Sequence, residues 1–293
     1  NSILLFFQEY KQGENTVRKI LMVVSLSSSL LFSGFALAEG TPAANPVASA
    51  SNTTSNNATN QIESTVHQYL MKKPEVVVEA LQAYQQKQME SMQKVFKDTQ
   101  KIVPNYVDVL FHQASDPIGG NADGAITVVE FSDYQCSHCI EVSPIVNQAM
   151  KANSDLKVVI KEFPIRGPMS EKASAAGLAA YRQGGAKYWA FRDALFHAAG
   201  AAPALTESKI YEVAQTAGLD VNQLKKDMED KSIKDAVAAN VTLAKNLKLM
   251  GTPAFFVAKS SVKNGVASDL VVYIPGLVTQ DQLQALIDQA KKQ

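Results

Sequence analysis

The sequence predicts an α/β fold in which the sheet is divided along the chain by a helical insertion. Two strand-like apolar runs, 126–131 and 156–163, flank a helical stretch, which is the layout of a βαβ unit with a parallel strand pair. The segment 169–249 then has a helical pattern almost throughout, and two further apolar runs follow it, at 255–257 and 270–274. The strands of one sheet are therefore expected to come from both sides of the insertion.

The region before the predicted sheet has a different composition. The segment 39–60 is expected to be a disordered linker, because its small and polar residues cannot bury enough apolar area to offset the entropy of ordering. Two helices are expected over 61–73 and 75–103, with Pro74 at the first turn of the second helix. Their apolar stripes are too narrow to form a core. We expect homodimerisation through 61–104, and packing on the rest of the same chain is the alternative.

The sheet-forming parts are expected at 105–168 and 250–293. In the first part, apolar residues alternate over 107–111 as in a strand, and turn-forming residues are dense over 116–124. The second part ends in an amphipathic helix over 279–292.

The balance of charges and the cysteine content exclude several classes of protein. The chain of 293 residues carries 28 basic and 28 acidic side chains, whereas proteins that bind nucleic acids need a strong positive excess. Only two cysteines occur, which excludes a disulfide-stapled mini-scaffold and a zinc site of three or four thiolates. We therefore expect a globular protein with no nucleic-acid partner and no bound metal.

The first 38 residues have the layout of a secretory signal peptide. A basic pair at 18–19 precedes the apolar stretch 20–35, and an Ala-x-Ala pattern follows, so cleavage is expected after Ala38. The apolar stretch is interrupted by serines and is shorter than the roughly 20 residues that span a bilayer, which makes a retained anchor the weaker alternative. Residues 1–16 do not fit the layout, and translation is expected to begin after them. The mature protein is expected to work outside the cytosol, where disulfides persist.

The two cysteines form a Cys-Ser-His-Cys motif between a predicted strand and a predicted helix. Cys136 is expected at the helix N-terminus, where free N–H groups and the helix dipole favour an anion, and His138 adds a hydrogen-bond donor. Such surroundings lower the pKa of a thiol from its usual value of about 8.5 and stabilise the reduced form relative to the disulfide. Cys139, one helical turn later, is placed to attack a mixed disulfide formed at Cys136.

Three alternatives to a redox pair are weaker. A structural disulfide across so short a loop gains little stability from chain entropy. Two inert thiols are unexpected in an oxidising compartment. A metal site needs more ligands, and the other histidines are scattered along the chain, at His67, His112 and His197. The motif therefore predicts redox chemistry.

Glu130 lies within an apolar strand, six residues before Cys136. It is either a solvated carboxylate at the strand end or a buried acid that relays the proton of Cys139 during thiol exchange. In the second case, Lys161 on the following strand is a candidate charge partner.

A second marker is the Thr252-Pro253 pair, which enters an apolar strand. A proline removes one N–H group from a sheet and is therefore confined to strand starts and edges. If the Pro253 peptide bond is cis, the chain turns sharply beside the cysteines, and the backbone of Thr252 can pair with an extended substrate segment. An ordinary trans proline is the alternative.

These residues, over roughly 116–292, resemble the DsbA-like thiol:disulfide oxidoreductases of the bacterial periplasm. The resemblance implies a thioredoxin fold with an inserted helical domain. It also implies that Cys136 is the nucleophile, Cys139 the resolving thiol, Pro253 a cis-proline and Glu130 a buried acid. The Cys136–Cys139 disulfide would be the redox-active group, with no other cofactor.

Two departures from the best-known oxidases of this family bear on function. Ser137 stands where those oxidases have Pro, and Thr252 stands where they have Val; Thr before the cis-proline is similar to the dimeric isomerases of the DsbC and DsbG type. Ser137, Thr252 and Pro253 are the expected substrate-binding residues. The region 61–104 also resembles the N-terminal oligomerisation segment of ScsC-like proteins. His138 is, in contrast, typical of strong oxidants.

The resemblance therefore implies a periplasmic homodimeric disulfide isomerase with some dithiol oxidase activity. Its partners would be unfolded or misoxidised exported proteins and a membrane redox protein. The alternatives are a monomer-like disulfide oxidase of the DsbA type and a redox-inactive periplasmic chaperone.

Overall fold

The computed structural model describes residues 53–202 and 204–293. It divides into two units, 1–72 and 73–293, of which the first is represented by the helix α2 (Thr53–Lys72). The predicted signal peptide, its cleavage site and the first part of the predicted linker lie outside the described residues. In the described part of the chain, no helix is both long enough and apolar enough to cross a bilayer.

The helix α2 begins earlier than predicted. Residues 53–60, expected to be disordered linker, are its first two turns. Once a helix is nucleated, each added residue gains a hydrogen bond without a new nucleation cost, so a polar sequence with little apolar content can extend it.

The unit 73–293 begins with the helix α3 (Glu75–Ile102), which starts directly after Pro74 as predicted. A short 3₁₀ turn, η1 (Val103–Asn105), leads to α4 (Val107–Phe111). The strand predicted over 107–111 is therefore wrong. Val107, Leu110 and Phe111 are buried while Val109 is exposed, and this i, i+3, i+4 spacing is that of a helix face.

The sheet has five strands in the order β1-β3-β2-β4-β5. The β2–β3 pair is parallel, as the βαβ pattern predicts, and every other neighbouring pair is antiparallel. The strand β1 was not predicted, because it lies in the turn-rich segment. The strands are β1 (Ile118–Gly120), β2 (Ile126–Ser132), β3 (Leu156–Glu162), β4 (Ala254–Lys259) and β5 (Val272–Pro275).

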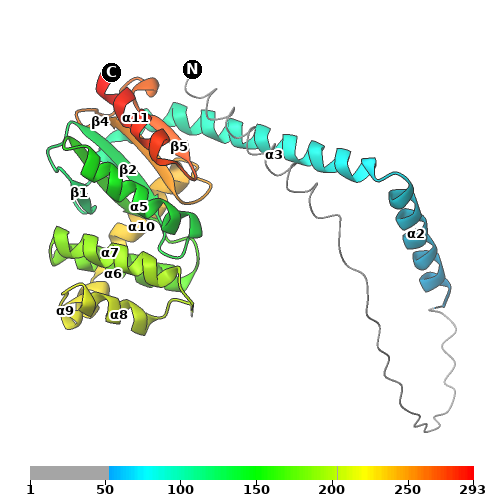
Figure 1. Ribbon diagram of the computed structural model, residues 1–293, viewed down its shortest axis with the longest axis horizontal. Helices are drawn as coiled ribbons and strands as arrows, with labels where there is room; N and C mark the ends of the chain where they lie inside the picture. The colour runs from blue at the N-terminus through cyan, green and yellow to red at the C-terminus, as the bar shows by residue number, and fades with distance from the viewer. Residues whose placement is uncertain (1–52, 203) are drawn as a thin grey trace, which may run out of the picture. The chain divides into compact units, whose positions relative to one another are not determined.

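Helices cover both faces of the sheet (Figure 1). The helices α5 (Ser137–Ala152) and α11 (Gln280–Lys292) pack on one face, and α11 begins with a capping box between Thr279 and Gln282. On the other face, α4 and α10 (Lys231–Asn246) surround a cluster that includes Phe131 and Phe256. All seven residues of β2 are buried, as expected for a central strand covered on both sides.

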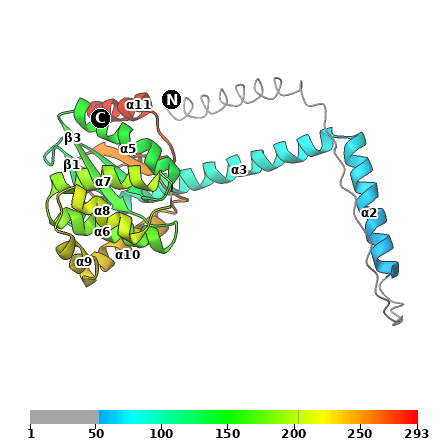
Figure 2. The same cartoon turned by 60° about the horizontal axis from the view of Figure 1, so that its bottom comes forward.

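The predicted helical insertion is confirmed. It contains α6 (Pro168–Arg182), α7 (Gly185–Ala199), α8 (Glu207–Thr216), α9 (Val221–Met228) and α10. The helices α6 to α9 gather beside the sheet, below it in Figure 1 and in front of it in Figure 2. Breaks fall near Gly184 and Gly218, where positive φ angles favour glycine, and side-chain caps start α8, α9 and α10 at Thr206, Asp220 and Asp230.

The C-terminal end of α3 is anchored to the sheet domain. Phe96 stacks on Tyr273 with ring centroids 5.7 Å apart, and the buried Thr99 hydroxyl donates to the Leu247 carbonyl at 2.8 Å. The Gln100 amide group donates to the Ser268 and Val271 carbonyls and accepts from the Tyr273 N–H. The alternative prediction, packing on the rest of the same chain, therefore holds for the last turns of α3. The remainder carries exposed apolar side chains, at Val77, Val78, Leu81, Tyr84 and Met92.

Candidate active site

The loop between β2 and α5 is fixed by a buried aspartate. Asp133 accepts hydrogen bonds from the N–H of Gln135 at 2.8 Å, from the N–H of Ile165 at 2.7 Å and from the Ser170 hydroxyl at 2.7 Å. These bonds tie the loop before α5 to the loop that follows β3. Cys136 comes next and is the N-cap of α5, so its thiol lies at the end of the helix where N–H groups are free. The predicted position of Cys136 is confirmed.

The Thr252–Pro253 peptide bond is cis and lies beside the cysteines. Cys136 Sγ lies 3.2 Å from the Thr252 carbonyl oxygen, to which the thiol donates when it is protonated. The Pro253 carbonyl accepts from the N–H of Gly276 at 2.9 Å, which joins this turn to the end of β5. We call the group formed by Cys136, Cys139, Thr252 and Pro253 the catalytic corner. Sequence positions 136 and 252 are thus brought into contact, as the two motifs predict.

The catalytic corner gives its two thiols opposite acidities. Both cysteines are buried and both are free thiols. A hydrogen bond from the Cys139 thiol is the main effect that lowers the pKa of Cys136 to about 4, and burial opposes it. Thr252 and the backbone N–H groups of Cys139 and His138 lower that pKa further. Burial raises the pKa of Cys139, and its hydrogen bond to Cys136 and the charge of Glu130 add to the rise. At neutral pH the corner therefore holds a thiolate at Cys136 and a thiol at Cys139.

The two residues between the cysteines face solvent. Ser137 and His138 are both exposed at the first turn of α5. His138 was expected to add a hydrogen-bond donor, and the donor that lowers the pKa of Cys136 is its backbone N–H. Ser137 stands beside Cys136 on the accessible side, which is compatible with its predicted contact to substrate.

Glu130 is a buried acid and not a solvated strand-end carboxylate, since its side chain is 0 % exposed. Burial raises its pKa, and the charge of Arg192 opposes that rise. Arg192 on α7 donates to Glu130 Oε2 at 2.8 Å and is itself 0 % exposed. The charge partner of Glu130 therefore comes from the helical insertion.

The expected pairing of Glu130 with Lys161 is wrong. In the β2–β3 register Glu130 lies opposite Ile160, while Lys161 lies opposite Phe131. Because side chains alternate between the two faces of a sheet, Lys161 points to the face opposite Glu130. There it forms a buried ion pair with Asp116 and donates to the carbonyl of Val109.

Comparisons with known proteins agree with this geometry. Residues 127–288, more than half of the chain, match the family model described as a DSBA-like thioredoxin domain. The chain belongs to the DsbA-like thioredoxin family. Residues 59–90 match a second model, the N-terminal domain of the copper resistance protein ScsC. The predicted thioredoxin fold with an N-terminal helical region and the predicted thiol:disulfide oxidoreductase class are both confirmed.

Three similar proteins illustrate this membership. The thioredoxin-like oxidoreductase from Silicibacter pomeroyi DSS-3 is 36% identical, with a TM-score of 0.55, and the match covers 64% of this chain and 98% of that one. BcfH from Salmonella enterica Typhimurium is 34% identical, with a TM-score of 0.59, over 80% of this chain and 96% of that one. The probable disulfide bond formation protein D of Bacillus anthracis is 29% identical over 146 residues, which are 47% of this chain and 67% of that protein.

This DsbA-like domain contains a second buried glutamate, Glu162, that the sequence analysis missed. Glu162 at the end of β3 accepts a hydrogen bond from the Tyr134 hydroxyl at 3.1 Å, and burial raises its pKa to about 8. Gly177 lets α6 approach, because a Cβ atom there would lie 2.8 Å from a Glu162 oxygen and 2.7 Å from the Tyr134 hydroxyl oxygen. An acid within an apolar strand is the same signal that singled out Glu130. Arg192, in contrast, has no local signal, since it lies 62 residues away from its partner.

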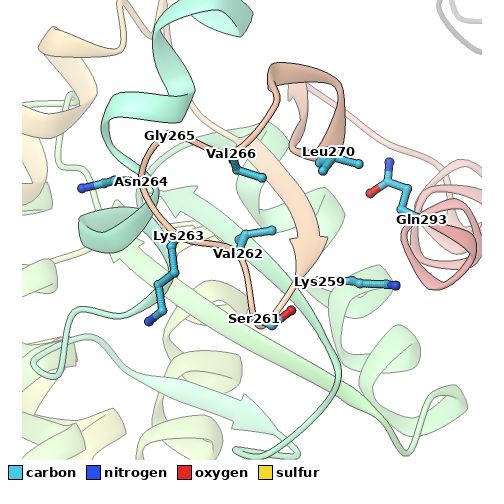
Figure 3. A pocket seen from close by; sticks show the side chains of 9 residues that line it. All are labelled: Lys259, Ser261, Val262, Lys263, Asn264, Gly265, Val266, Leu270 and Gln293. Carbon is cyan, nitrogen blue, oxygen red and sulfur yellow. The ribbon is translucent and has the colours of Figure 1, made fainter.

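One pocket lies away from the catalytic corner. It has a volume of about 420 Å³ and is lined by the loop after β4, with Lys259 and Lys263 among its residues, and by Gln293 (Figure 3). Because β4 runs from Pro253 toward Lys259, this pocket is at the opposite end of the strand from the cysteines. Within residues 53–202 and 204–293, no cluster of three or more histidine, cysteine and acidic side chains could hold a metal ion.

Proposed function

We propose that this protein is a self-associating disulfide isomerase of exported proteins, with some dithiol oxidase activity. The observation that carries the proposal is the set of exposed apolar side chains on helices that precede a thiolate-forming catalytic corner. Isomerisation needs a nucleophilic thiolate that opens wrong disulfides and a surface that holds a non-native chain. The corner supplies the first requirement, and an assembly through the helices would supply the second.

The reaction follows from the two acidities. The Cys136 thiolate attacks one sulfur of a wrong disulfide, and the other sulfur leaves as a thiolate with the electron pair of the broken bond. A second thiolate of the substrate then attacks the mixed disulfide, forms the correct bond and regenerates Cys136. If Cys139 attacks instead, the enzyme is left as its Cys136–Cys139 disulfide and the substrate is reduced. The cysteine pair is the only redox group that this cycle needs.

Apolar side chains next to the catalytic corner support an unfolded polypeptide as substrate. Ile165 is 41%, Met250 63% and Leu277 37% exposed. Each belongs to a segment tied to the corner, through Asp133, Thr252 and Gly276 respectively. Unfolded chains present apolar side chains and free backbone, and both find partners here.

Self-association is supported by the distribution of exposed apolar residues. Of the large apolar side chains that are exposed in the described residues, most lie on α2 and α3, and they recur at helical spacing. An exposed stripe of this kind marks a protein interface. We expect a homodimer through 61–104. On α2 the stripe consists of Ile62, Val66 and Tyr69.

Action in the periplasm is supported by the signal-peptide pattern that ends at Ala38. In that compartment exported proteins acquire disulfides, and wrong pairings need correction. A membrane redox partner that resets the cysteine pair belongs to the same proposal.

The test is reactivation of a scrambled-disulfide protein by residues 39–293. Two variants accompany it, Cys136→Ser and a truncation that starts at residue 93. The truncation keeps Phe96, Thr99 and Gln100 docked on the sheet domain and removes the exposed stripe. We expect recovery that requires both Cys136 and the helices. Equal recovery by the truncation would contradict the role of the helices.

The second candidate is a disulfide oxidase of the DsbA type, and the low pKa of Cys136 favours it. A stabilised thiolate makes the Cys136–Cys139 disulfide a good electron acceptor. Rapid oxidation of a reduced substrate without recovery of the scrambled one would select this alternative. If the protein is instead a redox-inactive chaperone, the Cys136→Ser variant should keep its full chaperone activity.

A further inference from the structure

Arg192 on α7 of the helical insertion contacts α5, the helix that begins at the cysteine pair. Arg192 donates to Glu130 Oε2 at 2.8 Å through Nη2, and to the Ser143 hydroxyl at 3.2 Å through Nη1. Ser143 is one helical turn after Cys139 on α5 and therefore shares its face. Arg192 thus bridges the strand that carries Glu130 and the helix face that carries Cys139.

The position of Arg192 is fixed on its other sides. Its guanidinium carbon is 5.1 Å from the Trp189 ring centroid and 4.8 Å from that of Phe196, which is cation–π geometry. The Trp189 N–H donates to the carbonyl of Ile118 on β1 at 3.0 Å, so α7 is held against the sheet edge. Because these contacts hold the Arg192 guanidinium in place, its hydrogen bond to Glu130 fixes the position of the carboxylate.

Of the two glutamates buried near Arg192, Glu130 is the one whose surroundings stabilise a negative charge. Two carboxyl groups, those of Glu130 and Glu162, are buried on one face of the sheet, and Arg192 is the cation in direct contact with one of them. Glu162 accepts instead from a neutral hydroxyl, and its pKa is raised to about 8, so it keeps its proton at neutral pH. A buried charge needs a partner, and the pair that meets this need is Glu130 with Arg192.

The other charged or titratable groups around Glu130 do not supply that partner. Asp133 is occupied by backbone N–H groups and Ser170, and Tyr134 and Tyr188 stay neutral because burial raises their pKa values. Lys161 is on the opposite face with Asp116.

We propose that Arg192 is a positioning residue of the redox centre, which keeps Glu130 ionised and leaves its second oxygen free to exchange a proton with Cys139. That oxygen, Oε1, is buried and has no hydrogen-bond partner among the residues that the structure describes. When Cys139 attacks the mixed disulfide at Cys136, its proton passes to Oε1. The Cys139 sulfur bonds to Cys136, and the substrate sulfur leaves with the electron pair of the broken bond. This inference rests on the thiol:disulfide exchange of the proposed function.

The inference gives the helical insertion a part in the chemistry. Because Arg192 comes from α7, the protonation state beside Cys139 depends on how α7 is seated on the sheet. Replacement of the guanidinium by an apolar group removes the charge that opposes the rise in the pKa of Glu130. The carboxyl would then be protonated at neutral pH and unable to accept the proton.

The test follows the two thiols separately in the full-length reduced protein. A dithiobis-nitrobenzoate releases one coloured thiolate when Cys136 attacks it, and a second when Cys139 resolves the mixed disulfide. In Arg192→Met we expect an unchanged first release and a second release slowed at least about tenfold at neutral pH, within the range of general acid–base catalysis. The pH dependence of the second release should move to higher pH. Arg192→Lys, which keeps the charge, should retain most of the rate.

Three controls separate positioning from mere structure. Lys161→Met breaks the other buried ion pair of the same domain, and it should lower stability without moving the pH dependence of the second release. Glu130→Gln should remove that pH dependence. Addition of Arg192→Met to Glu130→Gln, a combination that leaves no unpaired buried charge, should have no further effect on the second release.

The outcomes distinguish this inference from the proposed function. No coloured product from the wild-type protein would overturn the exchange chemistry itself. Two releases in the wild type, with an unshifted second release in Arg192→Met, would overturn the role of Arg192 and leave the exchange standing. An additive effect in the double variant would also overturn it, because Arg192 would then act by a route other than Glu130.

Discussion

The catalytic corner and the N-terminal helices place their characteristic side chains in opposite environments. Cys136, Cys139 and Glu130 are each 0 % exposed, whereas Leu81 is 55% and Tyr84 60% exposed on α3. At the corner, removal of water strengthens the electrostatic effects that separate the acidities of the two thiols. On the helices, apolar surface is left in contact with water, which costs free energy until a partner covers it. The reactivity of the thiols is thus set by contacts within the chain, whereas the proposed self-association would depend on the surface of a partner.

We expect the loss of Cys136 to remove disulfide exchange and to leave self-association through the helices unchanged. We expect Cys136→Ser to abolish disulfide exchange completely, because Cys139 alone is held as a thiol with a raised pKa. Cys139→Ser should instead accumulate mixed disulfides, which non-reducing electrophoresis would detect. The association state of both variants, measured by light scattering, should match that of the wild type. Exchange that survives in Cys136→Ser would refute the assignment of the nucleophile.

We expect charged residues on the apolar stripe of α3 to weaken self-association and to leave the reactivity of the cysteines unchanged. In Leu81→Glu/Tyr84→Glu we expect self-association weaker by at least about tenfold, because two apolar side chains of an interface become charged. Sedimentation or light scattering would measure it. Reactivation of a scrambled substrate should fall in parallel, while the first coloured release of the dithiobis-nitrobenzoate reaction stays unchanged.

A matched control adds the same charge to the other side of α3. Gln82→Glu/Gln86→Glu introduces two carboxylates at exposed polar positions, roughly half a turn away from Leu81 and Tyr84 on the helix. It should associate as the wild type does. If both double variants dissociate, net charge and not the apolar stripe controls assembly.

The pH dependence of alkylation sharpens the contrast between the two thiols. With a pKa of about 4, Cys136 is a thiolate at every higher pH, so its rate with iodoacetamide should be level near neutrality and fall as the pH drops through about 4. Cys139→Ala should move this fall to higher pH, since the largest stabilising hydrogen bond is lost. Cys139→Ser keeps an O–H donor and should move it less. An equal shift in both variants would show that the hydrogen bond is not the cause.

The smallest expected effect is on thermal stability and concerns Glu162, the buried glutamate at the end of β3. The pKa of Glu162 is raised to about 8 in the folded protein, so its contribution to stability is present below the pKa of the unfolded chain and is lost as the pH rises through about 8. Glu162→Gln mimics the protonated form. Its melting temperature should lie close to that of the wild type at pH 5 and exceed it by a few degrees at pH 9. A constant difference across this range would contradict the assigned protonation state.

Sequence patterns predict the parts of this molecule that depend on neighbours along the chain. The β2–α5–β3 unit and the helical insertion follow from the periodicity of apolar residues within each segment. The cysteine pair and its position at a helix N-terminus belong to the same class. The cis bond before Pro253 does not follow from the segment alone, where a trans proline was the alternative, and was implied by the family resemblance.

The features that were missed depend on contacts between distant segments. Residues 107–111 form a helix because three of their side chains fit a core built by α10 and the sheet, and two-residue alternation does not reveal that fit. The pairing of Glu130 with Arg192, and not with Lys161, depends on strand register and on a helix of the insertion. Neither is visible before the chain is folded, because a one-residue change of register reverses the face of every side chain.

The Gln100 side chain occupies hydrogen-bonding groups at the outer edge of the sheet, which bears on aggregation. β5 is an outer strand of the sheet, and free edges of this kind attract extended polypeptides, which add to them as new strands. The Gln100 amide fills the hydrogen bonds of β5 at Val271 and Tyr273 as a neighbouring strand would. If the protein acts on unfolded chains as proposed, this side chain would keep such chains from adding to β5 and would leave the Thr252 backbone as a place for them to pair.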